Sequence, residues 1–355
     1  MQSTTRETIH NVGTVRFKEK NVGIVIAVIA VLISAVALTL AFTVFKPKCP
    51  GPKIKPSVVV ALDGSGDFTT VSAAVAAAPS HSRKYFGIFI RPGVYHEQVR
   101  VPAEKTRLAF LGSGIGVTVI FSNRSWPEYS SEATATLHVK GDGFVAMDIS
   151  FENAGDPAAT GYTVALANDG DKTAFLRCSF KGYSGVVKAG RGLQFYGNVN
   201  IHGAVDVVWG SAAAVFQKCG MYPEKPLPDQ EGSSLTFQQR SAPFERAGFV
   251  FHGCYIAAPP LGSRVFLGRP GGAYSLVVVM DSYLSGPTAG WLPESSSPSL
   301  PKTLYLGEYK NGGVQGVGPG WKNMTAVEAS RFTVAGFING DKWLPDASVE
   351  YVSNF

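Results

Sequence analysis

Short apolar runs recur along this chain about every twenty residues, and this repeat limits the possible folds more than any other feature. Four runs place Phe at the second position and Cys or Asn three residues later: AFLRCSF at 174–180, QFYGNVN at 194–200, VFQKCGM at 215–221 and VFHGCYI at 250–256. Their Phe residues are 20, 21 and 35 residues apart. Units of this length bury an apolar face only by stacking on one another. The repeat therefore predicts an all-β protein, a parallel β-helix.

A β-sandwich with coincidental spacing is the alternative fold at this point. The composition suits a turn-rich β protein, because the chain has 40 Gly and only 16% charged residues. These values exclude a disordered chain and a coiled coil. One helix is predicted at Thr69–Ala78, after the turn-like run DGSGD at 63–67. In a β-helix, this short N-terminal helix would cap the exposed end of the stack.

An uncharged apolar run at 23–45 precedes the repeats and is 23 residues long. That length is enough to cross a bilayer as a helix. A cleaved signal peptide usually has a shorter apolar region, nearer the N-terminus, and a buried core helix would have a polar face. We therefore expect a cytosolic tail at 1–22, a transmembrane signal anchor at 23–45, a Pro- and Lys-rich stalk at 46–56 and the β-helix domain at 57–355.

The positive charge of the chain belongs to this N-terminal arm. Residues 1–56 hold eight Lys and Arg and two Glu, which accounts for the whole formal net charge of +6. The β-helix domain is neutral overall, so its charge does not favour nucleic-acid binding. Each flank of the apolar run carries four Lys or Arg, and the positive-inside rule therefore does not decide the orientation.

Two N-glycosylation sequons begin at Asn123 and Asn323. They favour a domain that enters the secretory pathway, although such three-residue patterns also arise by chance. We expect a glycoprotein whose membrane-anchored C-terminal domain lies in the Golgi lumen, the cell wall or the extracellular space.

Three of the four cysteines occupy the same position in the repeat. Cys219 and Cys254 lie in consecutive repeats, so their Cα atoms should be about 5 Å apart, within disulfide range. Cys178 is two repeats from Cys219, which is too far for a disulfide. We therefore predict a Cys219–Cys254 bridge in an oxidising compartment. The six His are scattered and no Cys/His spacing resembles a metal site, so no metal is expected.

Two charged residues stand in positions where chemistry is possible. Asp206 lies in the apolar run HGAVDVVWG, where a carboxylate is disfavoured unless it is paired or functional. Arg269 in FLGRPGG could pair with a carboxylate. A structural salt bridge is an equally good interpretation of either residue. The run GYSG at 182–185 differs from a serine-hydrolase nucleophile elbow, because Val186 replaces the last Gly.

The chain resembles the plant-type pectinesterases (pectin methylesterases) from about Val58 to its C-terminus. Collinear motifs carry the resemblance: ALDGSGDFTTVSAAVAAAP at 61–79, RPGVYHEQV at 91–99, GDGFVAMDISFENAG at 141–155, GAVDVVWGSAAAVFQKC at 203–219, FLGRP at 266–270, AGW at 289–291, TLYLGEYKNGG at 303–313 and FTVAGFINGDKWLP at 332–345. The resemblance implies a right-handed parallel β-helix that acts on cell-wall homogalacturonan without a metal or cofactor. In the family's reaction, one Asp attacks the methyl ester, a second Asp is general acid and then base, two Gln stabilise the oxyanion, and an Arg orients the nucleophile.

The resemblance assigns these roles to positions that are only partly retained. Asp206 matches the nucleophile and Arg269 the orienting Arg, and we expect the stacked coils to bring the two side by side. Gly185 replaces the general acid, while Ser184 and Tyr162 replace the two Gln.

Two Trp complete the expected site. Trp291 matches a substrate-lining Trp, and Trp209 replaces a Phe near the nucleophile. Core packing is as good an explanation as sugar contact for either of them.

These replacements predict a catalytically impaired protein. Loss of a general acid typically costs about 10²–10⁴ in rate, and loss of one oxyanion donor about 10²–10³. The Tyr162 hydroxyl and Lys188 are conceivable substitutes, but neither shuttles a proton near neutral pH as a carboxyl group does. We therefore expect a monomer that binds pectin with little or no hydrolysis. The alternative is an active pectinesterase with an altered mechanism or substrate choice that uses Asp206 and Arg269.

Overall fold

The computed structural model describes residues 54–355 except 126–129, 131, 157–160, 229–231, 259–262, 293–299 and 314–320. All described residues belong to one compact unit, Pro47–Phe355. The predicted tail at 1–22, the predicted membrane anchor at 23–45 and the stalk up to residue 53 lie outside the described residues. Within the described part of the chain, no helix is both long and apolar enough to cross a bilayer.

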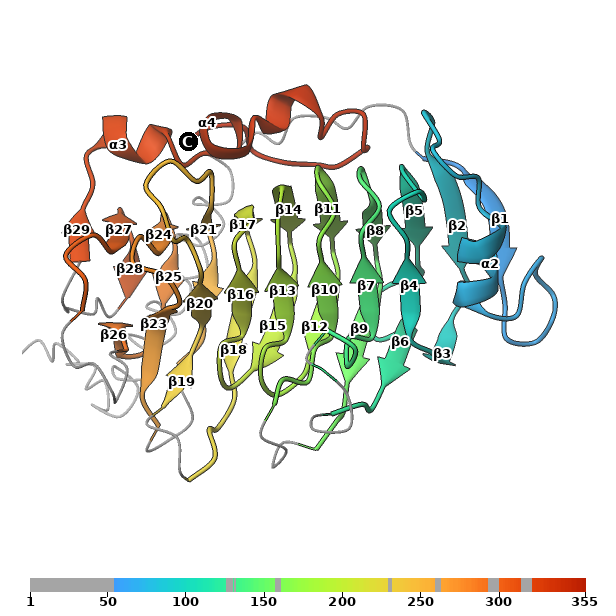
Figure 1. Ribbon diagram of the computed structural model, residues 1–355, viewed down its shortest axis with the longest axis horizontal. Coiled ribbons are helices and arrows are strands. Elements are labelled where there is room, and N and C mark those ends of the chain that lie inside the picture. Colours follow the sequence, from blue (N-terminus) through green and yellow to red (C-terminus); the bar gives the residue numbers. More distant parts are fainter. Residues whose placement is uncertain are drawn as a thin grey trace, which may run out of the picture. The chain divides into compact units, whose positions relative to one another are not determined.

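The described strands form three parallel sheets, and successive coils add strands to each sheet in turn (Figure 1). We number the sheets in the order in which the chain visits them. Within the described residues, the first sheet has eleven strands, which are in spatial order β1(Pro56–Val60), β2(Phe86–Ile90), β5(Leu108–Leu111), β8(Val145–Met147), β11(Thr173–Leu176), β14(Leu193–Gly197), β17(Ala213–Gln217), β21(Gly248–His252), β24(Leu276–Met280), β27(Tyr305–Tyr309) and β29(Trp321–Asn323).

The second and third sheets run beside the first. The described strands of the second sheet are β3(Gly93–His96), β6(Thr118–Ser122), β9(Ser150–Asn153), β12(Ser179–Lys181), β15(Asn200–Gly203), β18(Gly220–Pro223), β22(Tyr255–Ile256), β25(Tyr283–Leu284) and β28(Gly312–Gly313). Those of the third sheet are β4(Val99–Val101), β7(Leu137–Val139), β10(Leu166–Asn168), β13(Val187–Ala189), β16(Val208–Gly210), β20(Thr236–Gln238) and β23(Val265–Pro270), with β19(Ser233–Ser234) and β26(Thr288–Trp291) both paired to β23. The predicted parallel β-helix is confirmed.

A single left-handed residue turns the chain from the first sheet to the second in coil after coil. The φ angles at this position lie between 48° and 64° at Asp148, Arg177, Asn198, Lys218, Gly253, Asp281 and Lys310. Most non-glycine residues adopt this conformation only when the surrounding structure enforces it. The stacking of identical bends supplies that enforcement.

The predicted repeat needs one correction of register. Tyr196, rather than Phe195, pairs with Phe175 and Phe216 in the neighbouring strands, and Asn198 lies at the left-handed bend. Phe195 is buried on the opposite face of the sheet, where its ring centroid lies 6.5 Å from that of Tyr351. Because both faces of β14 are buried, hydrophobicity alone does not show which of the two aromatic residues faces the interior.

Aromatic side chains stack inside the coils. The rings of Phe175, Tyr196, Phe216 and Phe251 follow one another at centroid distances of 5.2, 4.5 and 4.9 Å, nearly parallel to each other. All four are buried in the main core. The ladder arises because residues in register on parallel strands lie about one strand spacing apart.

The helix α2(Val71–Ala77) confirms the predicted N-terminal helix, in slightly shorter form, and covers the first coil. The Thr70 side chain caps its N-terminus by accepting from the Ala73 N–H at 3.2 Å. The Glu97 carboxylate accepts from the Val71 and Ser72 N–H groups at 2.8 and 2.9 Å. These bonds satisfy donors that a helix leaves open at its first turn.

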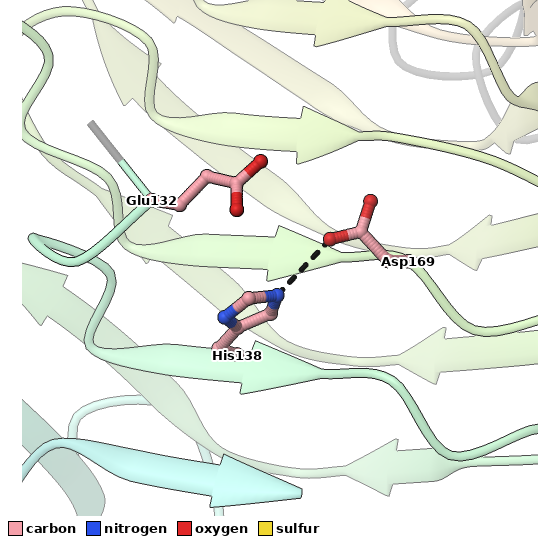
Figure 2. Close-up of side chains that lie close together, drawn as sticks. All are labelled: Glu132, His138 and Asp169. Carbon is pink, nitrogen blue, oxygen red and sulfur yellow. Dashed lines mark hydrogen bonds and ion pairs between the residues drawn. The ribbon is translucent and has the colours of Figure 1, made fainter. Parts of the chain in front are cut away.

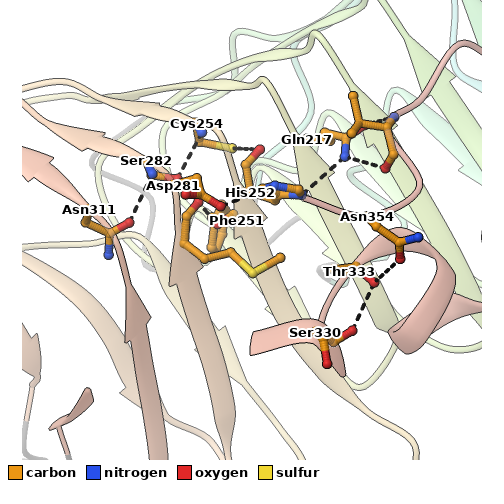
Figure 3. A network of polar contacts seen from close by, with 12 residues as sticks. Gln217, Phe251, His252, Cys254, Asp281, Ser282, Asn311, Ser330, Thr333 and Asn354 are labelled. Carbon is orange, nitrogen blue, oxygen red and sulfur yellow. Dashed lines mark hydrogen bonds and ion pairs between the residues drawn. The ribbon is translucent and has the colours of Figure 1, made fainter. Parts of the chain in front are cut away.

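The C-terminal segment covers the outer face of the first sheet (Figure 1). It contains α3(Ala326–Ser330), α4(Val334–Ile338) and the 3₁₀ helix η1(Gly340–Lys342), which sequence analysis does not predict. Gln217 of β17 holds its end: the Val352 N–H donates to Oε1 at 2.7 Å, and Nε2 donates to the Val352 carbonyl at 2.9 Å. Figure 3 shows His252 beside Gln217, where burial lowers the pKa of His252 to about 4.

The predicted Cys219–Cys254 disulfide is absent, and both residues are buried thiols. The predicted proximity is present, since the Cys219 N–H donates to Cys254 Sγ at 3.4 Å. Side chains in a parallel ladder leave their strands in the same direction and stay about 4.8 Å apart, whereas a disulfide needs a Cβ–Cβ distance of about 3.5–4.5 Å. Each thiol donates instead to a backbone carbonyl, Cys219 to Tyr196 and Cys254 to Phe216, at 3.3 Å.

The aromatic ladder should dominate the stability of this fold. Replacing Phe216→Ala should lower the free energy of unfolding by about 3–5 kcal/mol, because it removes a fully buried ring between two others. Phe244→Ala is the matched control, since Phe244 is 87% exposed. Denaturant titration followed by circular dichroism measures both. Equal losses in the two variants would contradict the role of the ladder.

Candidate active site

Asp206 lies between β15 and β16 and is 1% exposed. Its backbone is left-handed, with a φ of 49°. One hydroxyl group fixes both its backbone and its side chain: the Asp206 N–H donates to Ser234 Oγ, and Ser234 Oγ donates to Asp206 Oδ1, both at 2.8 Å. A carboxylate buried this deeply is stable only when it is paired and hydrogen-bonded.

Arg269, near the end of β23, supplies the pairing charge. Its Nε donates to Asp206 Oδ1 at 3.2 Å and its Nη2 donates to Oδ2, which makes the contact bidentate. The Phe237 ring lies 4.1 Å from the guanidinium carbon and supports it from one side. The structure thus brings Asp206 and Arg269 side by side, as sequence analysis expects.

Tyr162 occupies the space that a side chain at Gly185 would need. A Cβ atom at Gly185 would lie 2.3 Å from Tyr162 Cγ and 2.5 Å from Cδ2, distances that non-bonded carbons do not reach. The Tyr162 hydroxyl donates to Asp206 Oδ2 at 2.8 Å. Burial, followed by the charge of Asp206, raises the pKa of Tyr162, so the phenol keeps its proton.

Two further predicted site residues, Ser184 and Trp209, lie next to Tyr162 and Asp206. Ser184 pairs with Val205, the residue before Asp206, and is half-buried at the edge of the site. Trp209 Nε1 donates to the Gly185 carbonyl at 3.0 Å, and its ring centroid is 4.9 Å from that of Tyr162. Trp209 therefore belongs to the site.

Trp291 does not line an open surface, which corrects the prediction for this residue. It is 2% exposed and pairs with Gly268, the residue before Arg269. A Cβ atom at Gly268 would lie 2.6 Å from the Trp291 ring, so the missing side chain makes room for the indole. Trp291 thus supports the strand that carries Arg269.

A row of outward-facing residues on the third sheet leads to the site. Each member pairs with the next on the adjacent coil, in the order Arg100, His138, Ala167, Lys188, Trp209, Phe237 and Arg269. Neighbouring positions are about 4.8 Å apart. The row therefore carries basic and aromatic side chains along several coils and ends at the partner of Asp206.

Sequence analysis missed the acidic residues beside this row. Figure 2 shows Glu132, His138 and Asp169 close together, with His138 Nε2 3.0 Å from Asp169 Oδ2. Lys188 Nζ forms an ion pair with Glu132 and lies 3.2 Å from Asp169 Oδ1. Burial raises the pKa of Asp169, but the hydrogen bond from His138 and the charge of Lys188 outweigh it and leave the pKa below its usual value.

This cluster has the ligand types of a metal site, yet the Lys188 ammonium already forms ion pairs with both carboxylates. It is better described as an ion-pair network. The sequence does not predict this ion-pair network, because Glu132 and Lys188 are 56 residues apart.

The Asp206 carboxylate is fully occupied by donors. Tyr162, Ser234 and Arg269 give it four hydrogen bonds, two at each oxygen. A carboxylate offers about four lone-pair sites. A nucleophile needs one of them free, so a donor would have to leave before Asp206 could attack. Within the described residues, no second carboxyl group hydrogen-bonds to Asp206.

Comparison with known proteins gives one consistent result. The pectinesterase family model matches residues 57–341. The chain is 37% identical over 319 residues to the pectinesterase/pectinesterase inhibitor PPE8B of Prunus persica, covering 85% of this chain and 60% of that protein. It is 38% identical over 320 residues to a pectinesterase/pectinesterase inhibitor of Ficus pumila var. awkeotsang, covering 85% and 58%.

A solved structure agrees with these relatives. Pectin methylesterase from carrot has a TM-score of 0.79 and 34% identity, and the match covers 86% of this chain and all of that one. The chain spans between 55% and 60% of the length of the first curated relatives that it matches.

Removing Arg269 should destabilise the protein, because a buried Asp206 would lose its counter-charge. Arg269→Met should lower the free energy of unfolding by about 3–5 kcal/mol. The matched control is Arg177→Met, which breaks a partly exposed pair with Asp148 and should cost about 1 kcal/mol or less. In the double variant with Asp206→Asn, most of the loss should disappear. A loss that persists in the double variant would contradict this explanation.

Proposed function

The chain belongs to the pectinesterase family, and on this premise we propose that it binds pectin along the outward row of the third sheet, with little or no ester hydrolysis at Asp206. The observation that carries the proposal is the contact between Tyr162 and Gly185. The family's general acid would stand at position 185, and the Tyr162 ring fills the volume where its Cβ would lie. Tyr162, as placed, therefore leaves no room for an acidic side chain at position 185.

The state of Asp206 supports the same proposal. Tyr162 and Arg269 both donate to Oδ2, while Ser234 and Arg269 donate to Oδ1. Hydrogen bonds to the ionised form stabilise the carboxylate and weaken it as a nucleophile. Tyr162 cannot replace the missing acid, because its raised pKa makes the phenol a weaker acid than usual.

The surroundings of Asp206 favour an extended acidic polymer as the ligand. Arg100, Trp209 and Phe237 face outward in the row on the third sheet, and Arg269 ends it. Exposed Arg100 can attract the free carboxylates of homogalacturonan, and the rings of Trp209 and Phe237 can pack on the apolar faces of sugars. A surface of this kind can hold pectin without chemistry at Asp206.

An active pectinesterase with an altered mechanism or substrate choice is the second candidate. The retained bidentate contact between Asp206 and Arg269 favours it. In that case Tyr162 would have to leave Asp206 and donate to the oxyanion of the substrate. The two candidates differ in whether Asp206 is ever acylated.

We further propose that residues 23–45 anchor the protein in a membrane and that the β-helix domain is exported. The apolar run supports the anchor, and the exposure of Asn123 and Asn323 leaves both sequons open to modification.

Restoring the family's residues should create activity. The triple variant Tyr162→Gln, Ser184→Gln and Gly185→Asp should release methanol from methylated pectin at least about 100-fold faster than the unmodified chain, since it regains the acid and both oxyanion donors. Methanol oxidation coupled to a dye measures the rate.

Two controls accompany this variant. Adding Asp206→Asn should abolish the gain. Gly185→Asp alone should be destabilised, because its Cβ meets Tyr162. A triple variant that folds normally and stays inactive would show that Tyr162 and Gly185 are not the reason for the proposed impairment.

The anchor and export should be visible in cells. The full chain should remain in the membrane pellet after alkaline carbonate extraction, and protease added outside intact vesicles should leave the domain undigested. Treatment with an N-glycosidase should shift its mass, and Asn123→Gln with Asn323→Gln should remove the shift. A chain released by carbonate, with no glycosidase shift, would contradict both parts.

A further inference from the structure

Four aromatic side chains form a row on the outer face of the second sheet. They are His202, Tyr222, Tyr255 and Tyr283, one from each of the consecutive strands β15, β18, β22 and β25. Successive ring centroids are 4.6, 6.4 and 6.2 Å apart. The first pair and the last pair are stacked within 13° of parallel. We call this set the tyrosine row.

The register of the sheet explains how the tyrosine row stays continuous. Tyr255 pairs with Tyr283, but its partner on β18 is Gly220 and not Tyr222. A Cβ atom at Gly220 would lie 2.6 Å from the Tyr222 ring. Tyr222 therefore lies over Gly220, which brings its ring beside Tyr255. A larger residue at position 220 would interrupt the row.

Packing in the core does not explain why Tyr255 and Tyr283 lie in this row. Met221, Ile256 and Leu284, which alternate with these residues, fill the interior and are fully buried. By contrast, Tyr255 is 44% exposed and Tyr283 is 54% exposed. Several large rings together on the surface of a soluble domain usually mark a binding surface.

Charged residues stand at the His202 end of the row. Lys181 precedes His202 in the ladder and is exposed. Its charge acts on both His202 and Glu224. Glu224 is half-buried, and burial raises the pKa of its carboxyl group, while the adjacent Lys225 is exposed. Lys181 also pairs with Glu152 on the preceding coil, so this end carries Lys181 and Lys225 together with Glu152 and Glu224. Lys181 is the base beside the rings that a carboxylate of a bound chain can reach.

We propose that the tyrosine row binds an acidic polysaccharide chain of the pectin type, as a second site on a different sheet from the outward row that ends at Arg269. The chain would lie along the solenoid, with the apolar faces of its sugars on the rings and their carboxylates near Lys181. The choice of pectin among polysaccharides rests on the proposed function, whereas the existence of the site rests on the tyrosine row alone. A site of this kind would hold the protein on its polymer whether or not the third sheet is occupied.

The test measures binding of a de-esterified galacturonan oligomer to the full-length chain in detergent, with a cello-oligosaccharide as the neutral probe. Every variant carries Trp209→Ala, which removes a ring from the outward row of the third sheet. Loss of binding at that row and loss of binding at the tyrosine row therefore give different results. Replacing Tyr255→Ala together with Tyr283→Ala should weaken galacturonan binding about tenfold, the loss expected for two stacked rings. Tyr255→Phe with Tyr283→Phe keeps the rings and should retain most of the affinity.

The matched control is Phe244→Ala, which removes an exposed ring outside the row and should leave the affinity unchanged. Circular dichroism confirms that each variant is folded. Unchanged galacturonan affinity in the double alanine variant would overturn the proposal, as would an equal loss in Phe244→Ala. Stronger binding of the cello-oligosaccharide than of the galacturonan would overturn the assignment of an acidic polymer.

Discussion

In-register stacking of parallel strands is the constraint on which the rest of this molecule depends. It places equivalent residues of successive coils about 4.8 Å apart, which builds the Phe175–Phe251 ladder inside and the outward rows on the surface. The same stacking enforces left-handed bends at residues such as Arg177 and Lys218. Asp206 is held at such a bend, one coil before Ser234 and two before Arg269, so the site exists only while the coils keep their register.

Replacements at two contacting positions of the site can act together. Tyr162 and Gly185 share a single volume, and Tyr162 reaches Asp206 from that volume. The result is a buried carboxylate with a full set of donors and, within the described part of the chain, no second carboxyl group hydrogen-bonded to it. Under the proposed function, this carboxylate supports the fold and does not attack an ester, while the outward residues of the third sheet bind the polymer.

The sequence predicts those features that repeat or that follow local chemistry. The spacing of the apolar runs predicts the coils, and the run at 69–78 predicts the capping helix. Register is harder, because Phe195 and Tyr196 are both buried and either could face the interior. Contacts between distant residues carry no local signal, so neither the Glu132–Lys188 pair nor the Gln217–Val352 clamp is predictable. The cysteine pairing fails for a different reason, since the stacking predicts proximity but not the geometry that a disulfide requires.

The central claim is that Asp206 does not attack an ester. Any attack forms an acyl-Asp206 and releases methanol, whether or not water later removes the acyl group. Methanol should therefore be counted with the protein in molar excess over a methylated galacturonan oligomer, using Asp206→Asn as the blank. The account predicts that the two proteins give the same trace amount. Methanol approaching one equivalent per ester group, and absent with Asp206→Asn, would contradict it.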